Sequence, residues 1–179
     1  MDELDFEYLN TFPEGDPAGK ALVFLKAGIS TFATKNYRDE PTLKLIVAAL
    51  TQAPLLVPVG ADFDELLGGL NPEELSPDQE LHPKSGSKPT WVTARLSDGT
   101  EVIPMFTSRK EAAKGEKVPL MQYDPKDYFR ILMEIDMPAI INPFGEASFY
   151  MSQRFVKKCS AAAAAVTAVP HMANPLCMP

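Results

Sequence analysis

Apolar residues in the N-terminal third of the chain gather in short runs between polar segments. Residues 21–25 form an apolar pentad that fits either a helix or a buried strand, because so short a run has no period; we expect a helix. Apolar residues then recur at helical spacing from Leu43 to Leu50, after two acids and a proline of the kind that begin helices. This pattern predicts a mostly buried helix over 39–52.

The next segment, residues 53–59, is apolar without alternation, which is typical of a strand covered on both faces. Residues 60–90 are rich in acids, proline, glycine and serine. This composition predicts a long, solvent-exposed connection, with a short helix at Asp62–Leu67.

A β-hairpin is predicted over residues 91–106, because Asp98-Gly99 favours a two-residue type I′ turn. Pairing outward from that turn places Leu96 opposite Glu101, Ala94 opposite Ile103, Val92 opposite Met105, Arg95 opposite Val102 and Trp91 opposite Phe106. Pro104 has no N–H to donate, so we expect its strand to lie at a sheet edge or to carry a bulge.

The second half of the chain alternates short strands with helices. A capping box at Ser108–Glu111 predicts a short helix, and residues 118–122 predict a strand. A helix follows Asp124-Pro125, with an apolar face of Tyr128, Ile131, Leu132 and Ile135. Two strands, 139–141 and 147–151, flank a turn at 142–145, and a helix begins at Gln153.

This order of elements predicts a single α+β (or α/β) domain, with a mixed sheet of about five strands that includes the hairpin and packs with several helices. We divide the chain into an acidic N-terminal segment over 1–38, which contains the first helix, a central domain over 39–158, and a tail over 159–179. The tail is alanine-rich and then broken by prolines; it can dock back on its own domain or bind a neighbour.

Composition narrows the function classes. The 179 residues are 45% hydrophobic and need no metal or disulfide to build a core, because chains of this size bury roughly 70% of their unfolded surface. No apolar stretch approaches the roughly 18–20 residues of a membrane-spanning helix, and the acidic start lacks the positive charge of a signal peptide. We therefore expect a cytoplasmic protein with no membrane contact.

The net charge of −7 is concentrated in residues 1–16 and 62–80, which hold acids and no bases. The remaining lysines and arginines are dispersed, whereas nucleic-acid binding usually requires clustered bases. We expect no nucleic-acid partner.

No hydrolase, nucleotide-binding or zinc motif is present, so we expect no enzymatic activity, no cofactor and no metal. His82 and His171 are expected to be solvated. The carboxylates of Asp62, Asp64 and Glu65 lack the glycine and distal glutamate of a calcium loop.

Cys159 is the one catalytic candidate, because Lys157 and Lys158 precede it and nearby ammonium groups favour a thiolate. The alternative is a small side chain packed near the C-terminal helix. We expect both Cys159 and Cys177 to be free thiols.

Several segments together resemble the SseB protein N-terminal domain family. They are LKLIVAALTQAPLLVPV, DGTEVIPMFTS running into a helix, and MPAIINPFGEASFYM, within residues 41–151. The resemblance implies a bacterial cytoplasmic domain without an established enzymatic mechanism and with roles that are unknown or based on protein interaction. The acidic stretch of 62–80 and the tail are not part of the pattern.

We therefore expect a non-catalytic protein-interaction or regulatory module with an unidentified protein partner. The candidate partner-binding residues are Asn142, Pro143, Phe144 and Gly145, in a turn where the phenylalanine is either exposed or tucked onto the sheet, together with Trp91 and Phe106. One alternative is a sulfur-handling or small-molecule-binding protein that uses Cys159. Another is a homo-oligomer that associates through the Pro104 strand and the tail.

Overall fold

The structure is a computed structural model, in which residues 16–60, 90–115 and 118–167 are described. Several expectations fall outside these ranges. They are the connection after Gly60 with its short helix at Asp62–Leu67 and its carboxylates, His82, His171, Cys177 and the tail from residue 168.

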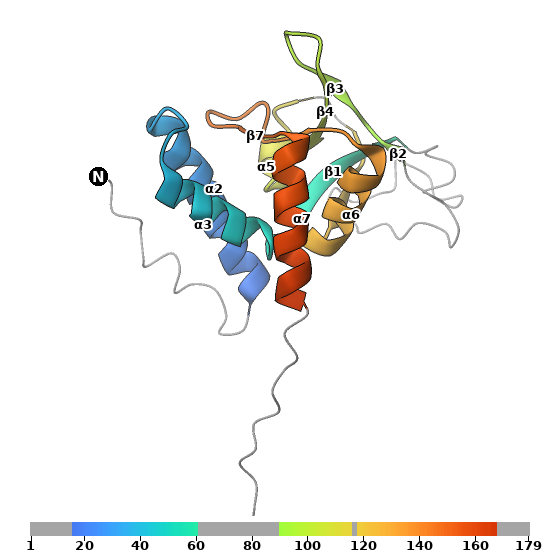
Figure 1. The fold of residues 1–179 in the computed structure, drawn as a ribbon. Coiled ribbons are helices and arrows are strands. Elements are labelled where there is room, and N and C mark those ends of the chain that lie inside the picture. Colours follow the sequence, from blue (N-terminus) through green and yellow to red (C-terminus); the bar gives the residue numbers. More distant parts are fainter. Residues whose placement is uncertain (1–15, 61–89, 116–117, 168–179) are drawn as a thin grey trace, which may run out of the picture.

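The described elements follow the predicted order and confirm a mixed α+β domain (Figure 1). They are α2 (Pro17–Thr34), α3 (Glu40–Leu50), β1 (Leu55–Gly60), β2 (Thr90–Trp91), β3 (Ala94–Arg95), β4 (Glu101–Met105), α5 (Arg109–Ala112), β5 (Leu120–Tyr123), α6 (Pro125–Ile135), β6 (Ala139–Ile141), β7 (Phe149–Met151) and α7 (Gln153–Thr167). The apolar pentad at 21–25 is helical, as expected, and lies within α2.

The strands form two sheets in the orders β2-β1-β5 and β3-β4-β6-β7. The pairing of β4 with β6 is parallel and the other pairings are antiparallel. An isolated bridge between Leu56 of β1 and Phe106, just after β4, joins the two sheets. Because β4 and β6 are parallel, their carboxyl ends lie next to each other.

Local capping explains where three helices begin. The Asp16 carboxylate accepts from the Gly19 N–H at 2.9 Å, the Asp39 carboxylate accepts from the Thr42 N–H and hydroxyl, and the Ser108 hydroxyl accepts from the Glu111 N–H at 3.3 Å. The bonds from the Gly19, Thr42 and Glu111 N–H groups satisfy first-turn amides that have no partner within their helices.

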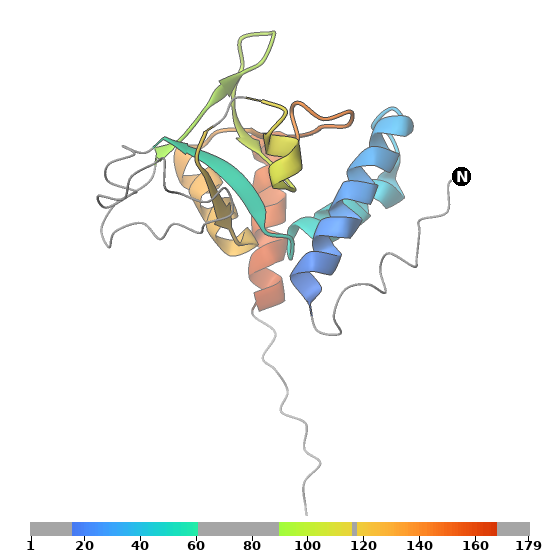
Figure 2. The same cartoon turned by 180° about the vertical axis from the view of Figure 1, so that it is seen from behind.

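Helices α6 and α7 lie over one side of the strands, with α2 and α3 packed against each other beside them, and α5 lies on the other side (Figures 1 and 2). The main core lies between the strands and helices α2, α3, α6 and α7. Its fully buried large side chains include Leu25, Ile29, Ile46, Leu50, Leu55, Ile103, Met105, Tyr128, Phe129, Leu132, Ile141 and Met151. Within α6, Tyr128 and Leu132 are buried as predicted, whereas Ile135 is exposed and Phe129, which the predicted face did not include, is buried.

The boundaries expected at residues 38 and 158 do not separate packing units. Helix α2 contributes Ala21, Leu25 and Ile29 to the same core as the strands. Helix α7 runs through residue 158 without a break and buries Val156 and Cys159 in that core.

The hairpin forms, but its predicted register is wrong. The Gly99 N–H donates to the Leu96 carbonyl at 2.9 Å, and Gly99 has a φ of +87°. The loop therefore holds three residues and ends in a left-handed glycine, which shifts the pairing by one position. The observed partners are Ala94 with Val102 and Arg95 with Glu101. The arms then diverge: Trp91 pairs with Val59, and Phe106 bridges to Leu56.

Pro104 does not lie in an edge strand, because β4 is flanked by β3 and β6. The Ile103 N–H donates to Pro138 on the β6 side, so the nitrogen of the next residue, Pro104, points to the opposite side. On that side, the pairing with β3 stops at Val102. The next backbone hydrogen bond on that side is donated by the Phe106 N–H to the Leu56 carbonyl of β1. The missing donor falls in this gap, so the expectation of an edge strand at Pro104 is wrong, and self-association of the protein stays a prediction.

Candidate functional site

The loop from Asn142 to Gly145, hereafter the Phe144 loop, connects β6 to β7 and is fixed at its first residue. Asn142 is buried and has a left-handed φ of +52°. Its side-chain oxygen accepts from the Thr107 N–H, and its amide nitrogen donates to the Thr107 hydroxyl, both at 3.0 Å. A turn closes the loop where the Gly145 N–H donates to the Asn142 carbonyl at 3.0 Å.

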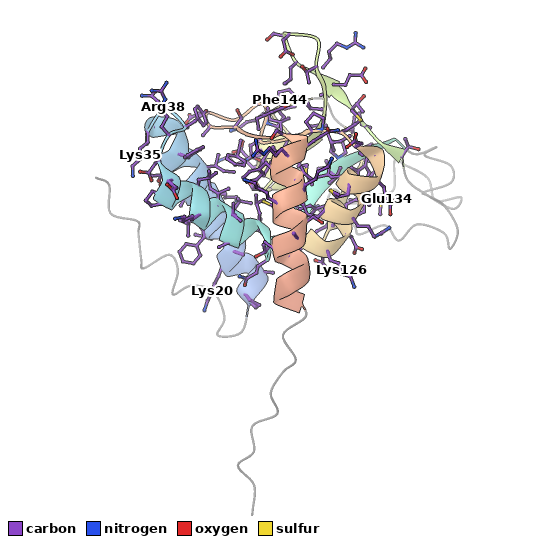
Figure 3. The ribbon with its side chains drawn as sticks, viewed as in Figure 1. Lys20, Lys35, Arg38, Lys126, Glu134 and Phe144 are labelled. Atoms are coloured by element: carbon purple, nitrogen blue, oxygen red, sulfur yellow. The ribbon has the colours of Figure 1, made fainter. Side chains whose placement is uncertain are left out.

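Phe144 is half exposed, with 50% of its surface accessible. One face of its ring stacks on Phe106, with ring centres 6.2 Å apart and planes at 23°. The ring also lies directly over Gly115, where an added Cβ would come within 2.2 Å of a ring carbon. Both alternatives for Phe144 are thus partly correct: the ring is held against the protein and still presents an apolar surface near the top of the molecule (Figure 3).

Helix α5 supports the other side of the loop. A Cβ on Gly145 would lie 2.8 Å from a carboxylate oxygen at the end of the Glu111 side chain and 3.3 Å from the Asn142 carbonyl oxygen, so the loop and α5 are in close contact here. Glu111 forms an ion pair with Lys114 at 2.9 Å. Aromatic side chains are enriched at the centre of protein interfaces, and polar groups such as this ion pair belong to the solvent-accessible rim.

The structure brings Phe106 together with the Phe144 loop but does not bring Trp91 there. Phe106 is buried and supports the exposed ring from beneath. Trp91 packs edge-on against Tyr123 with ring centres 5.2 Å apart and belongs to the sheet of β1, β2 and β5.

Sequence reasoning missed Thr107 and Gly115, which position the loop. The signal that could have identified Thr107 is the parallel pairing of β4 with β6, since Thr107 and Asn142 follow the ends of these strands. Tyr150 was placed correctly in a strand, but its 48% exposure was not anticipated.

Cys159 lies on the buried side of α7 and is fully inaccessible. Burial raises the pKa of its thiol to about 11, opposite to the lowering expected from the neighbouring lysines. Lys157 and Lys158 are both exposed, and Lys157 lies 3.8 Å from Asp136. The thiol is therefore protonated near neutral pH.

Neither a metal-binding cluster nor a membrane-spanning helix occurs among the described residues. Within 16–60, 90–115 and 118–167, no group of three or more histidine, cysteine or acidic side chains is arranged to hold a metal ion. Among the helices in these ranges, none has the length and apolar character to cross a membrane.

The fold and the loop define a small mixed α+β domain whose most prominent site is an exposed aromatic loop supported from beneath. Residues 31–158 match the SseB protein N-terminal domain, and the chain therefore belongs to this family. The match confirms the resemblance drawn from residues 41–151 and includes the whole Phe144 loop with its supports. Neither a curated protein nor a solved structure matches the chain.

Proposed function

We propose that this protein is a non-catalytic interaction or regulatory module of the bacterial cytoplasm that binds a protein partner through the Phe144 loop. The observation that carries the proposal is the half-exposed Phe144 ring on a loop whose backbone is already fixed. Membership of the SseB family supports the choice of domain type and names no partner.

The rigidity of the loop supports a binding role. Ordering an interface loop on association costs free energy, and a preorganised loop avoids much of that cost. Buried bonds to Thr107 hold Asn142, and Gly115 and Phe106 hold the Phe144 ring. A partner would cover the exposed half of the ring, as in the central aromatic contacts that dominate many interfaces.

A sulfur-handling role for Cys159 lacks comparable support. A nucleophilic thiol requires access and a lowered pKa, whereas this thiol is buried and its pKa is raised to about 11.

The test is affinity capture with the tagged full chain from its native cytoplasm, followed by quantitative mass spectrometry. Phe144→Ser removes the ring, and Leu45→Ser is the matched control because Leu45 is 37% exposed on α3. We expect a stoichiometric partner with the wild type and with Leu45→Ser. Loss of a central aromatic contact should reduce its recovery about tenfold or more with Phe144→Ser.

Thermal unfolding of each variant establishes that it remains folded. Equal recovery of the partner by all three chains would move the binding site away from the Phe144 loop. A bait that recovers no stoichiometric partner in any form would contradict the interaction function itself.

A further inference from the structure

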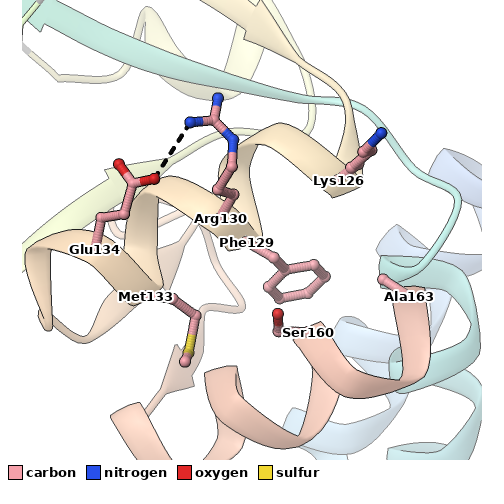
Figure 4. A pocket seen from close by; sticks show the side chains of 7 residues that line it. All are labelled: Lys126, Phe129, Arg130, Met133, Glu134, Ser160 and Ala163. Carbon is pink, nitrogen blue, oxygen red and sulfur yellow. Dashed lines mark hydrogen bonds and ion pairs between the residues drawn. The ribbon is translucent and has the colours of Figure 1, made fainter. Parts of the chain in front are cut away.

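A groove lies between α6 and α7 (Figure 4), and Figure 3 shows two of its lining residues, Lys126 and Glu134, well apart from Phe144. It encloses about 420 Å³. The residues that line it are Lys126, Phe129, Arg130, Met133 and Glu134 of α6 and Ser160 and Ala163 of α7. Lys126 and Ala163 lie toward one end, and Met133 and Glu134 lie toward the other (Figure 4).

The chemistry of the groove favours an uncharged, apolar occupant. Phe129 and Met133 supply apolar lining, and 40% of the Met133 surface is accessible. The Arg130 guanidinium on the rim is already paired with Glu134 at 3.3 Å and with Asp127 at 3.5 Å. These pairs offset the charge of Arg130, so the middle of the groove is largely apolar and the Lys126 ammonium lies at one end.

The sequence that follows α7 has the matching chemistry. Residues 168–179 contain no aspartate, glutamate, lysine or arginine. Their large apolar side chains are Val169, Met172, Leu176 and Met178. Pro170 disfavours continuation of the helix and suits a change of chain direction.

The length of the segment after α7 also fits the length of the groove. Helix α7 ends at Thr167, four positions beyond Ala163, which lines the groove at its Lys126 end. The groove extends along α6 from Lys126 to Glu134, a rise of about 12 Å at 1.5 Å per residue. A segment of twelve residues reaches about 40 Å when extended, enough to turn back and follow the whole groove.

We propose that the groove between α6 and α7 binds the chain's own residues 168–179, which turn back after α7 and place apolar side chains against Phe129 and Met133. This intramolecular contact is independent of the Phe144 loop. It covers apolar surface that α6 and α7 otherwise leave open to solvent.

A disulfide-trapping experiment on the full chain tests this contact with native Cys177 as one partner. Met133→Cys places a thiol in the groove. Ala161→Cys is the matched control, because Ala161 is exposed on α7 and does not line the groove. Cys159 is buried and does not compete. The rate of intramolecular disulfide formation in oxidised glutathione is followed by mass spectrometry of digests.

We expect the disulfide with Cys177 to form about tenfold faster in Met133→Cys than in Ala161→Cys, because docking raises the effective concentration at one site only. Equal rates would show an undocked segment and overturn the proposal. Faster formation of a covalent dimer would assign the groove to a second copy and also overturn it. If Met133→Cys unfolds, Arg130→Cys on the rim replaces it.

A second measurement needs no substitution in the groove. The methyl NMR signal of Met133 is compared between the full chain and a chain that stops at Thr167. We expect it to shift in the shorter chain while the signal of buried Met105 stays in place. An unchanged Met133 signal would contradict docking.

Discussion

Thr107 and Asn142 lie 35 positions apart in sequence and are joined by two buried hydrogen bonds of 3.0 Å, one in each direction. Thr107 follows β4, Asn142 follows β6, and these two strands are parallel. The pair thereby fixes the start of the Phe144 loop to the start of the segment that leads into α5.

Replacing Asn142 with glycine should reduce the free energy of unfolding by about 1–3 kcal/mol, because the buried Thr107 N–H and hydroxyl lose their partner. Glycine retains the positive φ without strain, so the loss reports the hydrogen bonds. Asn142→Ala should cost about 1 kcal/mol more, because alanine is strained at a φ of +52°. Urea denaturation measures both values, and a glycine variant as stable as the wild type would refute the role of the pair.

The contact between Gly115 and Phe144 predicts a strong coupling. Gly115→Ala should destabilise the protein by about 1–3 kcal/mol, because its methyl group would overlap the Phe144 ring. In a Phe144→Ala background the same substitution should cost little, since the obstructing ring is absent. A double-mutant cycle on unfolding free energies measures the coupling. Additive effects would mean that the ring does not rest on Gly115.

Tyr128 donates its buried hydroxyl to the carbonyl of Leu50, the last residue of α3, and so links α6 to the end of that helix. Tyr128→Phe keeps the ring and leaves this carbonyl without that donor. We expect a loss of about 1–2 kcal/mol in unfolding free energy. Tyr123→Phe, in the half-buried tyrosine of β5, is the control and should change stability less. Equal effects would argue against a specific link.

The elements of this fold could be predicted because their signals are local. Asp39 and Ser108 cap helices through bonds to residues three positions away, so a short window of sequence contains the full cause. The hairpin register could not be read in the same way. A loop of two or three residues fits the same Asp98-Gly99 pair, and only the packing of the arms selects one.

The site was only partly predictable for a related reason. The Phe144 loop stood out as a turn with an unusual phenylalanine, but its supports, Thr107 and Gly115, reach it only through the parallel pairing of β4 with β6. The lysines before Cys159 misled because successive helical residues point in different directions. Lys157 and Lys158 face solvent while the thiol faces the core.

The buried thiol of Cys159 predicts a specific dependence of stability on pH. Burial raises its pKa from 9.0 to about 11 in the folded protein. The folded state therefore holds its proton more tightly than the unfolded state, and this contribution is fully present below pH 9. It is lost as the pH rises from about 9 to 11, at about 1.4 kcal/mol per unit.

Cys159→Ala removes this titration, so its stability should fall less steeply over that interval than the stability of the wild type. Tyr128, whose pKa is also raised by burial, contributes equally to both chains apart from its interaction with Cys159. Urea denaturation at pH 7.5, 9.0 and 10.0 measures the two slopes, and the cavity left by alanine lowers all values for the variant without changing its slope. Parallel slopes would show that the thiol ionises as readily in the folded protein as in the unfolded chain. The case for Cys159 as a reactive thiol would then reopen.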